Sequence, residues 1–157
     1  MSNLIYALSF SLLLVPFSDK TIETATKTIV GTWISVDDKT GEERSHIKIY
    51  KSKNGLYYGK ILKLLFKPEG QDNPICTNCP KDDYRYNQPI KGLVVISQLK
   101  GSKDLKSAVR GKVLDPETGY IVDCQIELDE DNDDILKVRG YWKMVSIGVT
   151  QTWKRLE

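Results

Sequence analysis

The amino-acid sequence predicts an all-β fold, an eight-stranded antiparallel up-and-down barrel. From residue 29 onward, apolar residues alternate with polar ones or form short runs, and no apolar stripe recurs at helical spacing. Residues that favour turns separate these stretches at hairpin-like intervals. Closure into a barrel removes the unpaired edges that eight such strands would otherwise leave. A two-sheet sandwich is the alternative fold.

The eight strands are expected at 30–37, 45–51, 56–65, 90–99, 108–114, 120–128, 135–141 and 149–155. In 120–128, even-numbered positions are apolar and most odd-numbered positions are polar, which is typical of a strand with one buried face. The stretch 90–99 is apolar on both faces, which predicts a central strand.

Turn chemistry connects the strands. Asn54-Gly55 predicts a type I′ hairpin turn with positive φ at both central residues. Asp115-Pro-Glu-Thr-Gly119 predicts another hairpin, because proline restricts φ early in the turn and glycine accepts the left-handed conformation late. Residues 66–89 contain four prolines and are expected to form a long loop. Loops of this length in compact domains are often functional.

Length and charge restrict the classes of function. The 157 residues suit one domain, expected at 26–157 behind a leader at 1–25. The chain has 23 basic and 21 acidic residues, spread along its length without a basic stripe that contains aromatic residues. The sequence therefore offers little electrostatic support for nucleic-acid binding.

Residues 4–17 are apolar apart from two serines and carry no charge. This stretch is shorter than the roughly 20 residues that span a bilayer, and it has the length of the apolar region of a signal peptide. We therefore expect export, with the mature chain beginning between 19 and 26. The alternative is a buried N-terminal helix that plugs one end of the barrel. No cysteine lies near this segment, which excludes an N-terminal lipid anchor on cysteine.

Cys76 and Cys79 form a C-x-x-C motif between prolines of the expected loop. In an exported protein we expect them to form a disulfide bond with each other. Cys124 shares an apolar strand face and is expected to be free and buried. A redox centre would need a thioredoxin-type strand and helix. A zinc site would have to recruit Cys124 and His46 from strands. Neither a metal nor a cofactor is expected.

Two further features predict no chemistry. Asp129, Asp131 and Asp133 resemble the start of a calcium-binding loop, but Asp134 replaces the required glycine and Gly140 the final glutamate. A solvated hairpin turn is the expected structure. His46 is the only histidine and has no partnered nucleophile in a recognisable motif, so the chain is not expected to be an enzyme.

The order and spacing of short motifs over residues 29–157 resemble those of the bacterial DUF2147 family. The motifs are Gly31-Thr-Trp33, Ile49-Tyr50, Asn54-Gly55, Tyr58-Gly-Lys-Ile61, Asn73-Pro74, Gly92-Leu93, Asp115-Pro116, Gly119, Leu136-Lys-Val-Arg-Gly-Tyr141, Thr150-Gln-Thr-Trp153 and Arg155. The resemblance implies an exported, mostly periplasmic protein with a lipocalin-like barrel and no established reaction. Many relatives have an arginine where this chain has Val149.

Gly31-x-Trp33 together with Arg155 also resembles the wider lipocalin signature. In that signature a cation from the last strand covers a tryptophan of the first strand. The resemblance implies that Gly31, Trp33 and Arg155 close one end of the barrel. A cation–π contact of this kind contributes about 0.5–2 kcal/mol.

The candidate ligand contacts are Trp33, Arg139, Tyr141 and Trp153. If the polar face of 135–141 points inward, Arg139 could hold an anionic head group; if it points outward, Arg139 is solvated.

The first hypothesis for function is a non-enzymatic, exported barrel that binds a small apolar or amphipathic molecule. The second is an envelope structural or protein-interaction module whose barrel is filled by its own side chains. The third is a weak enzyme that uses 66–89 as a lid. No nucleic-acid partner and no membrane span are expected in the mature chain.

Overall fold

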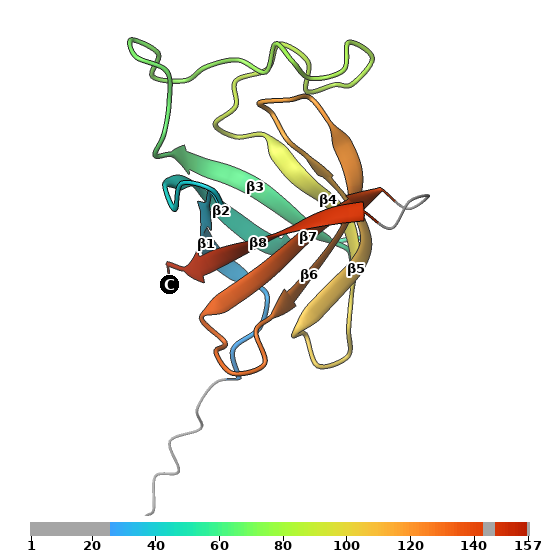
Figure 1. The fold of residues 1–157 in the computed structure, drawn as a ribbon. Helices are drawn as coiled ribbons and strands as arrows, with labels where there is room; N and C mark the ends of the chain where they lie inside the picture. The colour runs from blue at the N-terminus through green and yellow to red at the C-terminus, as the bar shows by residue number, and fades with distance from the viewer. Residues whose placement is uncertain (1–25, 143–146, 157) are drawn as a thin grey trace, which may run out of the picture.

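The chain forms a closed antiparallel barrel in which each strand pairs with its neighbours in sequence (Figure 1). The computed structural model describes residues 26–142 and 147–156. The strands are β1 (Gly31–Val36), β2 (Glu43–Lys51), β3 (Tyr57–Leu64), β4 (Val94–Gly101), β5 (Ser107–Leu114), β6 (Ile121–Leu128), β7 (Ile135–Trp142) and β8 (Ile147–Arg155). Because β8 pairs with β1, the predicted barrel is confirmed and the two-sheet sandwich is excluded. The leader predicted at 1–25 lies outside the described residues.

The largest difference from the expected strands is at β4, which begins at Val94 instead of residue 90. The N–H of Ile90 donates to the carbonyl of Pro74, and Gly92 has a φ of 101°. These residues therefore belong to the long connection between β3 and β4, which covers 65–93. No helix in the described part of the chain is long and apolar enough to cross a membrane.

The turn at Asn54-Gly55 differs in type from the prediction. Only Gly55 has a positive φ, of 82°, and its N–H donates to the carbonyl of Ser52 at 2.9 Å. A left-handed glycine at the end of a longer loop is the usual alternative to a two-residue type I′ turn. The hairpin position was predicted correctly, but its geometry was not.

Alternate connections of an up-and-down barrel lie at opposite ends, and we name the two ends by their turns. The closed end contains the connections 52–56, 102–106 and 129–134, with the start of β1. The loop end contains 37–42, 115–120 and the long connection 65–93, which arches over the barrel at the top of Figure 1.

Paired interruptions in β4 and β5 let the sheet bend. Gln98 and Arg110 have φ values of 60° and 62°, in the left-handed region, between regular pairs on either side. At Gly111, a Cβ would lie 2.6 Å from the carbonyl oxygen of Ser97. Glycine therefore lets β4 approach β5 closely where both strands change direction.

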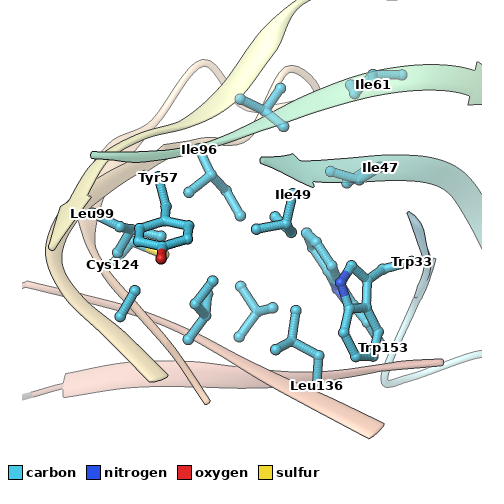
Figure 2. Close-up of a cluster of buried hydrophobic side chains, with 14 of the residues drawn as sticks. Trp33, Ile47, Ile49, Tyr57, Ile61, Ile96, Leu99, Cys124, Leu136 and Trp153 are labelled. Carbon is cyan, nitrogen blue, oxygen red and sulfur yellow. The ribbon is translucent and has the colours of Figure 1, made fainter. Parts of the chain in front are cut away.

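The core lies inside the barrel and is made by the inward-facing residues of all eight strands. Figure 2 shows side chains from opposite walls that point toward one another. The fully or almost fully buried residues include Trp33, Ile47, Ile49, Tyr57, Ile61, Ile96, Leu99, Ala108, Cys124, Ile126, Leu136, Val138 and Trp153. Burial of each large apolar side chain contributes about 1.5–3 kcal/mol, so this cluster supplies the main drive for folding.

Candidate functional site

The closed end is sealed by Trp33 and Arg155. The guanidinium carbon of Arg155 lies 4.1 Å from the centroid of the Trp33 ring, and the indole N–H of Trp33 donates to the carbonyl of Ile29 at 3.0 Å. Arg155 also donates to the carbonyls of Thr28 and Asp133, both at 2.9 Å. Arg155 thus ties the segment before β1 to the turn before β7, across the end of the barrel.

The interior next to this seal is packed with side chains. Trp153, Leu136 and Ile49 lie against Trp33 in Figure 2, and all are buried. Dense packing of this kind leaves little space between side chains. The candidate ligand contacts Trp33 and Trp153 are therefore core residues of the closed end.

Cys124 also belongs to the packed core of the barrel. Its thiol is completely buried, and burial raises its pKa to about 12. A thiol with such a pKa stays protonated at neutral pH and is a poor nucleophile.

Toward the loop end the barrel is less completely closed. β1 and β8 form two register pairs, Trp33 with Arg155 and Ile34 with Lys154. β7 and β8 pair continuously over eight residues. Among the described residues, the part of β8 from Gly148 to Thr152 makes no register pair with β1. The wall between β1 and β8 therefore opens toward the loop end.

Along β7 and β8, the inward-facing side chains pass from buried to exposed. β7 and β8 pair without a register shift, so Leu136, Trp142, Val149 and Ile147 share one face of the hairpin. Leu136 is 0% exposed, whereas Trp142, Val149 and Ile147 are 50%, 64% and 66% exposed. The apolar character of this face continues beyond the packed core, although no described residue covers its outer part.

Tyr120 completes this surface from the turn before β6. Its ring meets the Trp142 ring edge to face, with centroids 6.0 Å apart. Gly140, on the same inward face as Trp142, lies close to Val122, from whose side chain a Cβ at position 140 would be 3.1 Å away. We call Tyr120, Trp142, Ile147 and Val149 the apolar rim.

A layer of polar side chains lies between the packed core and the apolar rim. The hydroxyl groups of Ser35 and Ser45 are 2.8 Å apart and both residues are buried. Gln151, one inward position beyond Trp153, accepts a hydrogen bond from the Trp153 indole N–H at 3.0 Å. Each hydroxyl group has one donor and two acceptor sites, so the serine pair retains capacity to bind a polar atom of a ligand.

The long connection 65–93 is held rigidly over the loop end. Cys76 and Cys79 form a disulfide bond. The buried guanidinium of Arg85 donates two hydrogen bonds to the Asp83 carboxylate, at 2.8 and 2.7 Å, and one to the carbonyl of Val94 at the start of β4. These contacts hold the pKa of Asp83 below its usual value.

The same connection packs on the turn between β5 and β6. The side-chain amide of Asn78 donates to the carbonyl of Glu117 at 2.6 Å. Gly119 has a φ of 77°, and a Cβ there would lie 1.8 Å from the carbonyl oxygen of Asn78. Arg44 on β2 forms an ion pair with Glu117, which adds a link from the other side of the barrel.

Comparison with known proteins agrees with this architecture. Residues 31–155 match the family described as "Uncharacterized protein conserved in bacteria (DUF2147)". The chain belongs to the DUF2147 family. No curated protein sequence matches the chain. Among solved structures, it is similar to protein HP1028 from Helicobacter pylori, which is described as a member of the lipocalin family. The TM-score is 0.67 at 21% identity, over 84% of this chain and 85% of the other. The shared feature is the barrel fold.

Two of the candidate ligand contacts lie on the outer face of this DUF2147 barrel. Arg139 pairs in register with Gln125 and Thr150, and its strand neighbours Val138 and Gly140 face inward. Tyr141 is on the same outer face as Arg139. The structure therefore corresponds to the alternative in which the polar face of 135–141 points outward, and Arg139 and Tyr141 do not face the interior. The alternation of residues along β7 shows that the strand has two faces. Which face points into the barrel is known only once the neighbouring strands are placed.

Three carboxylates of the acidic turn between β6 and β7 form ion pairs with lysines of the protein. Asp129 pairs with Lys137, Asp133 with Lys106, and Asp134 with Lys27. In the described part of the chain, no group of three or more His, Cys, Asp or Glu residues is arranged to hold a metal ion. The remaining candidate surface of the DUF2147 barrel is therefore the apolar rim with the polar layer beneath it. In the sequence, the rim corresponds only to Tyr120 and to scattered apolar residues between 142 and 149.

Proposed function

We propose that this DUF2147 protein is an exported, periplasmic, non-enzymatic barrel that binds a small apolar or amphipathic molecule at its loop end. The observation that carries the proposal is the exposure of Trp142, Ile147 and Val149 on an inward-facing surface. An exposed apolar surface rimmed by polar groups is typical of an interaction site. Mouths of β-barrels are also frequent positions of ligand sites.

The arrangement of polar and apolar groups favours an amphipathic ligand. Its apolar part would lie on the apolar rim, and a polar atom would meet the hydroxyl groups of Ser35 and Ser45 or the amide of Gln151. The packed closed end supports binding at the loop end instead of deep in the barrel. The DUF2147 and lipocalin similarities are compatible with this function.

Non-covalent binding is also favoured over catalysis by the chemistry of the buried groups. Cys124 is the one free cysteine of the described chain, and its raised pKa disfavours the reactive thiolate. The other groups with shifted pKa values are largely carboxylates paired with cations at the surface, as at Asp72 and Asp129. Such pairs are typical of structural ion pairing.

A binding titration with the fluorescent apolar probe N-phenyl-1-naphthylamine tests the proposal. The double variant Trp142→Ala, Val149→Ser changes two of the four residues of the apolar rim. The control variant Leu62→Ala removes an apolar side chain that is 39% exposed at the bulge of β3, away from the apolar rim. We expect the double variant to weaken probe binding at least about tenfold, which corresponds to 1.4 kcal/mol, and the control to leave it within about twofold. Equal weakening by both variants, or no probe binding by the wild type, would contradict the proposal.

Native mass spectrometry of protein purified from its own cells would identify the natural ligand. We expect a co-purifying small molecule that is lost from the Trp142→Ala, Val149→Ser variant. Repeated recovery of ligand-free protein, without probe binding, would favour the filled-barrel interaction module instead. The packed closed end is the observation that supports that second function.

A further inference from the structure

The outer face of β1, β2, β3 and the end of β8 carries four lysines from three strands. One row across the sheet contains Lys154, Ile34, His46 and Lys63, which are consecutive register partners. The neighbouring row contains Thr32, Lys48 and Lys60. We call Lys48, Lys60, Lys63 and Lys154 the lysine face. Strands lie about 4.8 Å apart, so the longer row extends over about 14 Å. Figure 1 shows these strands side by side.

The charges of the lysine face are not neutralised within the described structure. All four lysines are exposed, and none takes part in a salt bridge among the described residues. On the other side of the barrel, Lys112 is paired with Asp123 and Lys137 with Asp129. The lysine face therefore carries unpaired positive charge, although the net charge of the chain is only +2.

The close spacing of these lysines lowers the stability of the fold. Lys48 and Lys60 are directly opposite each other on adjacent strands, where like charges are destabilising. No carboxylate lies directly beside them on the described strands. Their nearest outward neighbours are Thr32, His46, Tyr50, Tyr58 and Val94. A surface that retains such repulsion is suited to an external anionic partner.

The aromatic residues beside the lysines indicate which anionic partner fits. Tyr50 and Tyr58 form the next row, with stacked rings whose centroids are 6.0 Å apart. Both tyrosines are half-buried, which leaves less ring surface for stacking with nucleic-acid bases. Half-buried tyrosines next to lysines on the outer wall match the head-group region of a bilayer, where tyrosine is enriched and lysine stems lie along apolar surface.

We propose that the lysine face docks the barrel onto the surface of a bilayer that contains anionic phospholipid. The ammonium groups lie among the phosphate groups, with Tyr50 and Tyr58 at the same level and the barrel wall flat against the membrane. Each lysine near an anionic bilayer strengthens binding about fivefold. Four lysines together should therefore raise the binding constant for the membrane by about two to three orders of magnitude. This docking is independent of a ligand at the apolar rim.

Co-sedimentation with phosphatidylglycerol–phosphatidylethanolamine vesicles tests the proposal, with phosphatidylcholine vesicles as the neutral reference. The face variant replaces Lys48, Lys60, Lys63 and Lys154 with glutamine. The matched control replaces four exposed lysines of other regions with glutamine, which are Lys39, Lys81, Lys91 and Lys103. Both variants change the net charge equally, and circular dichroism verifies that both are folded.

We expect the wild type to bind the anionic vesicles and to dissociate in 1 M salt, where the Debye length falls to about 3 Å. The partition coefficient should fall at least about 100-fold in the face variant and less than about fivefold in the control. Equal losses in both variants would show that only net charge matters and would overturn the proposal. Binding to single-stranded DNA without binding to the vesicles would also overturn it, in favour of a nucleic-acid partner.

Discussion

The two ends of this barrel are built from the same strands, but they differ in how their inward-facing apolar residues are covered. At the closed end, Trp33 is enclosed by core side chains and by Arg155. At the loop end, Trp142 is half exposed. The two tryptophans therefore allow a direct comparison of a structural role and a proposed binding role for the same side chain.

The difference arises from the junction between β1 and β8. Where these strands pair, at Trp33 and Ile34, the interior is closed and packed. Beyond that point β7 and β8 continue as a hairpin whose inner face includes Val149 and Ile147. The comparison shows that the residues that stabilise the fold and the residues proposed to bind a ligand lie at opposite ends of the barrel. Substitutions at the closed end should destabilise the fold, and substitutions at the loop end should mainly change binding.

The largest effect is expected from Trp33→Ala. Removal of a completely buried aromatic side chain should lower the free energy of unfolding by about 3–5 kcal/mol. Arg155→Ala should cost less, because it loses the cation–π contact and the hydrogen bonds to Thr28 and Asp133. Chemical denaturation of both single variants and the double variant forms a complete cycle. The two losses of unfolding free energy should be non-additive, since the residues are in contact. Strictly additive losses would contradict a contact between Trp33 and Arg155.

Asp83→Asn should have the next largest effect, because it leaves the buried guanidinium of Arg85 without its charged partner. The expected loss is about 1.5–3 kcal/mol in the free energy of unfolding at neutral pH. The pKa of Asp83 is lowered by its hydrogen bonds with Arg85, so its stabilising contribution is present above the ordinary value of 3.8. That contribution is lost as the pH falls below this value.

The measurement for Asp83→Asn is therefore the difference in unfolding free energy between the variant and the wild type as a function of pH. The difference should be largest near pH 7 and should shrink as the pH falls below about 3.8. Asp82→Asn changes the exposed neighbour and serves as the control. A difference that stays constant down to strongly acidic pH would show that the charge of Asp83 is not the cause.

Removal of the disulfide should destabilise the connection 65–93 moderately. In the chain-entropy account, a ring as short as Cys76–Cys79 contributes about 2 kcal/mol. Cys76→Ser, Cys79→Ser should therefore lower the unfolding midpoint, and a reducing agent should have the same effect on the wild type. Cys124→Ser controls for the loss of a thiol. If reductant shifts the double serine variant as far as it shifts the wild type, the effect does not come from this bond.

Trp142→Ala should have the smallest effect on stability, although it removes the same side chain as Trp33→Ala. Half of this side chain is already in solvent, and its main aromatic contact is the edge-to-face contact with Tyr120. Such a contact contributes about 0.5–1.5 kcal/mol, and the loss should be of that size. Calorimetry of Trp142→Ala beside Trp33→Ala measures the contrast. A loss for Trp142→Ala as large as for Trp33→Ala would mean that the two ends do not differ in packing.

Much of this architecture could be predicted from local features of the sequence. Alternation along 120–128 and the turn at Asp115–Gly119 correspond to β6 and its preceding hairpin turn, because both depend on residues close in the chain. The start of β4 was missed, since the apolar residues near Ile90 pack in the long connection instead of extending the strand. Local apolar content does not distinguish these two outcomes.

The candidate site was predicted less well than the fold. Gly31, Trp33 and Arg155 lie together at the closed end, as the lipocalin signature implies. The predicted ligand contacts, however, are divided between the packed core and the outer face at Arg139 and Tyr141. Periodicity reveals that a strand has two faces, but the neighbouring strands decide which face is inside.

The sequence by itself determined the class of fold, the order of the strands, and the pairing of Cys76 with its neighbour Cys79, because these depend on short-range alternation and chain geometry. Only the tertiary structure decided the apolar rim and the lysine face. Lys154 and Lys63 are far apart in the chain, and they share a row because β8, β1, β2 and β3 pair in one particular register. A shift of one residue in any of these strands would turn its side chains to the opposite face, so no local pattern contains this information.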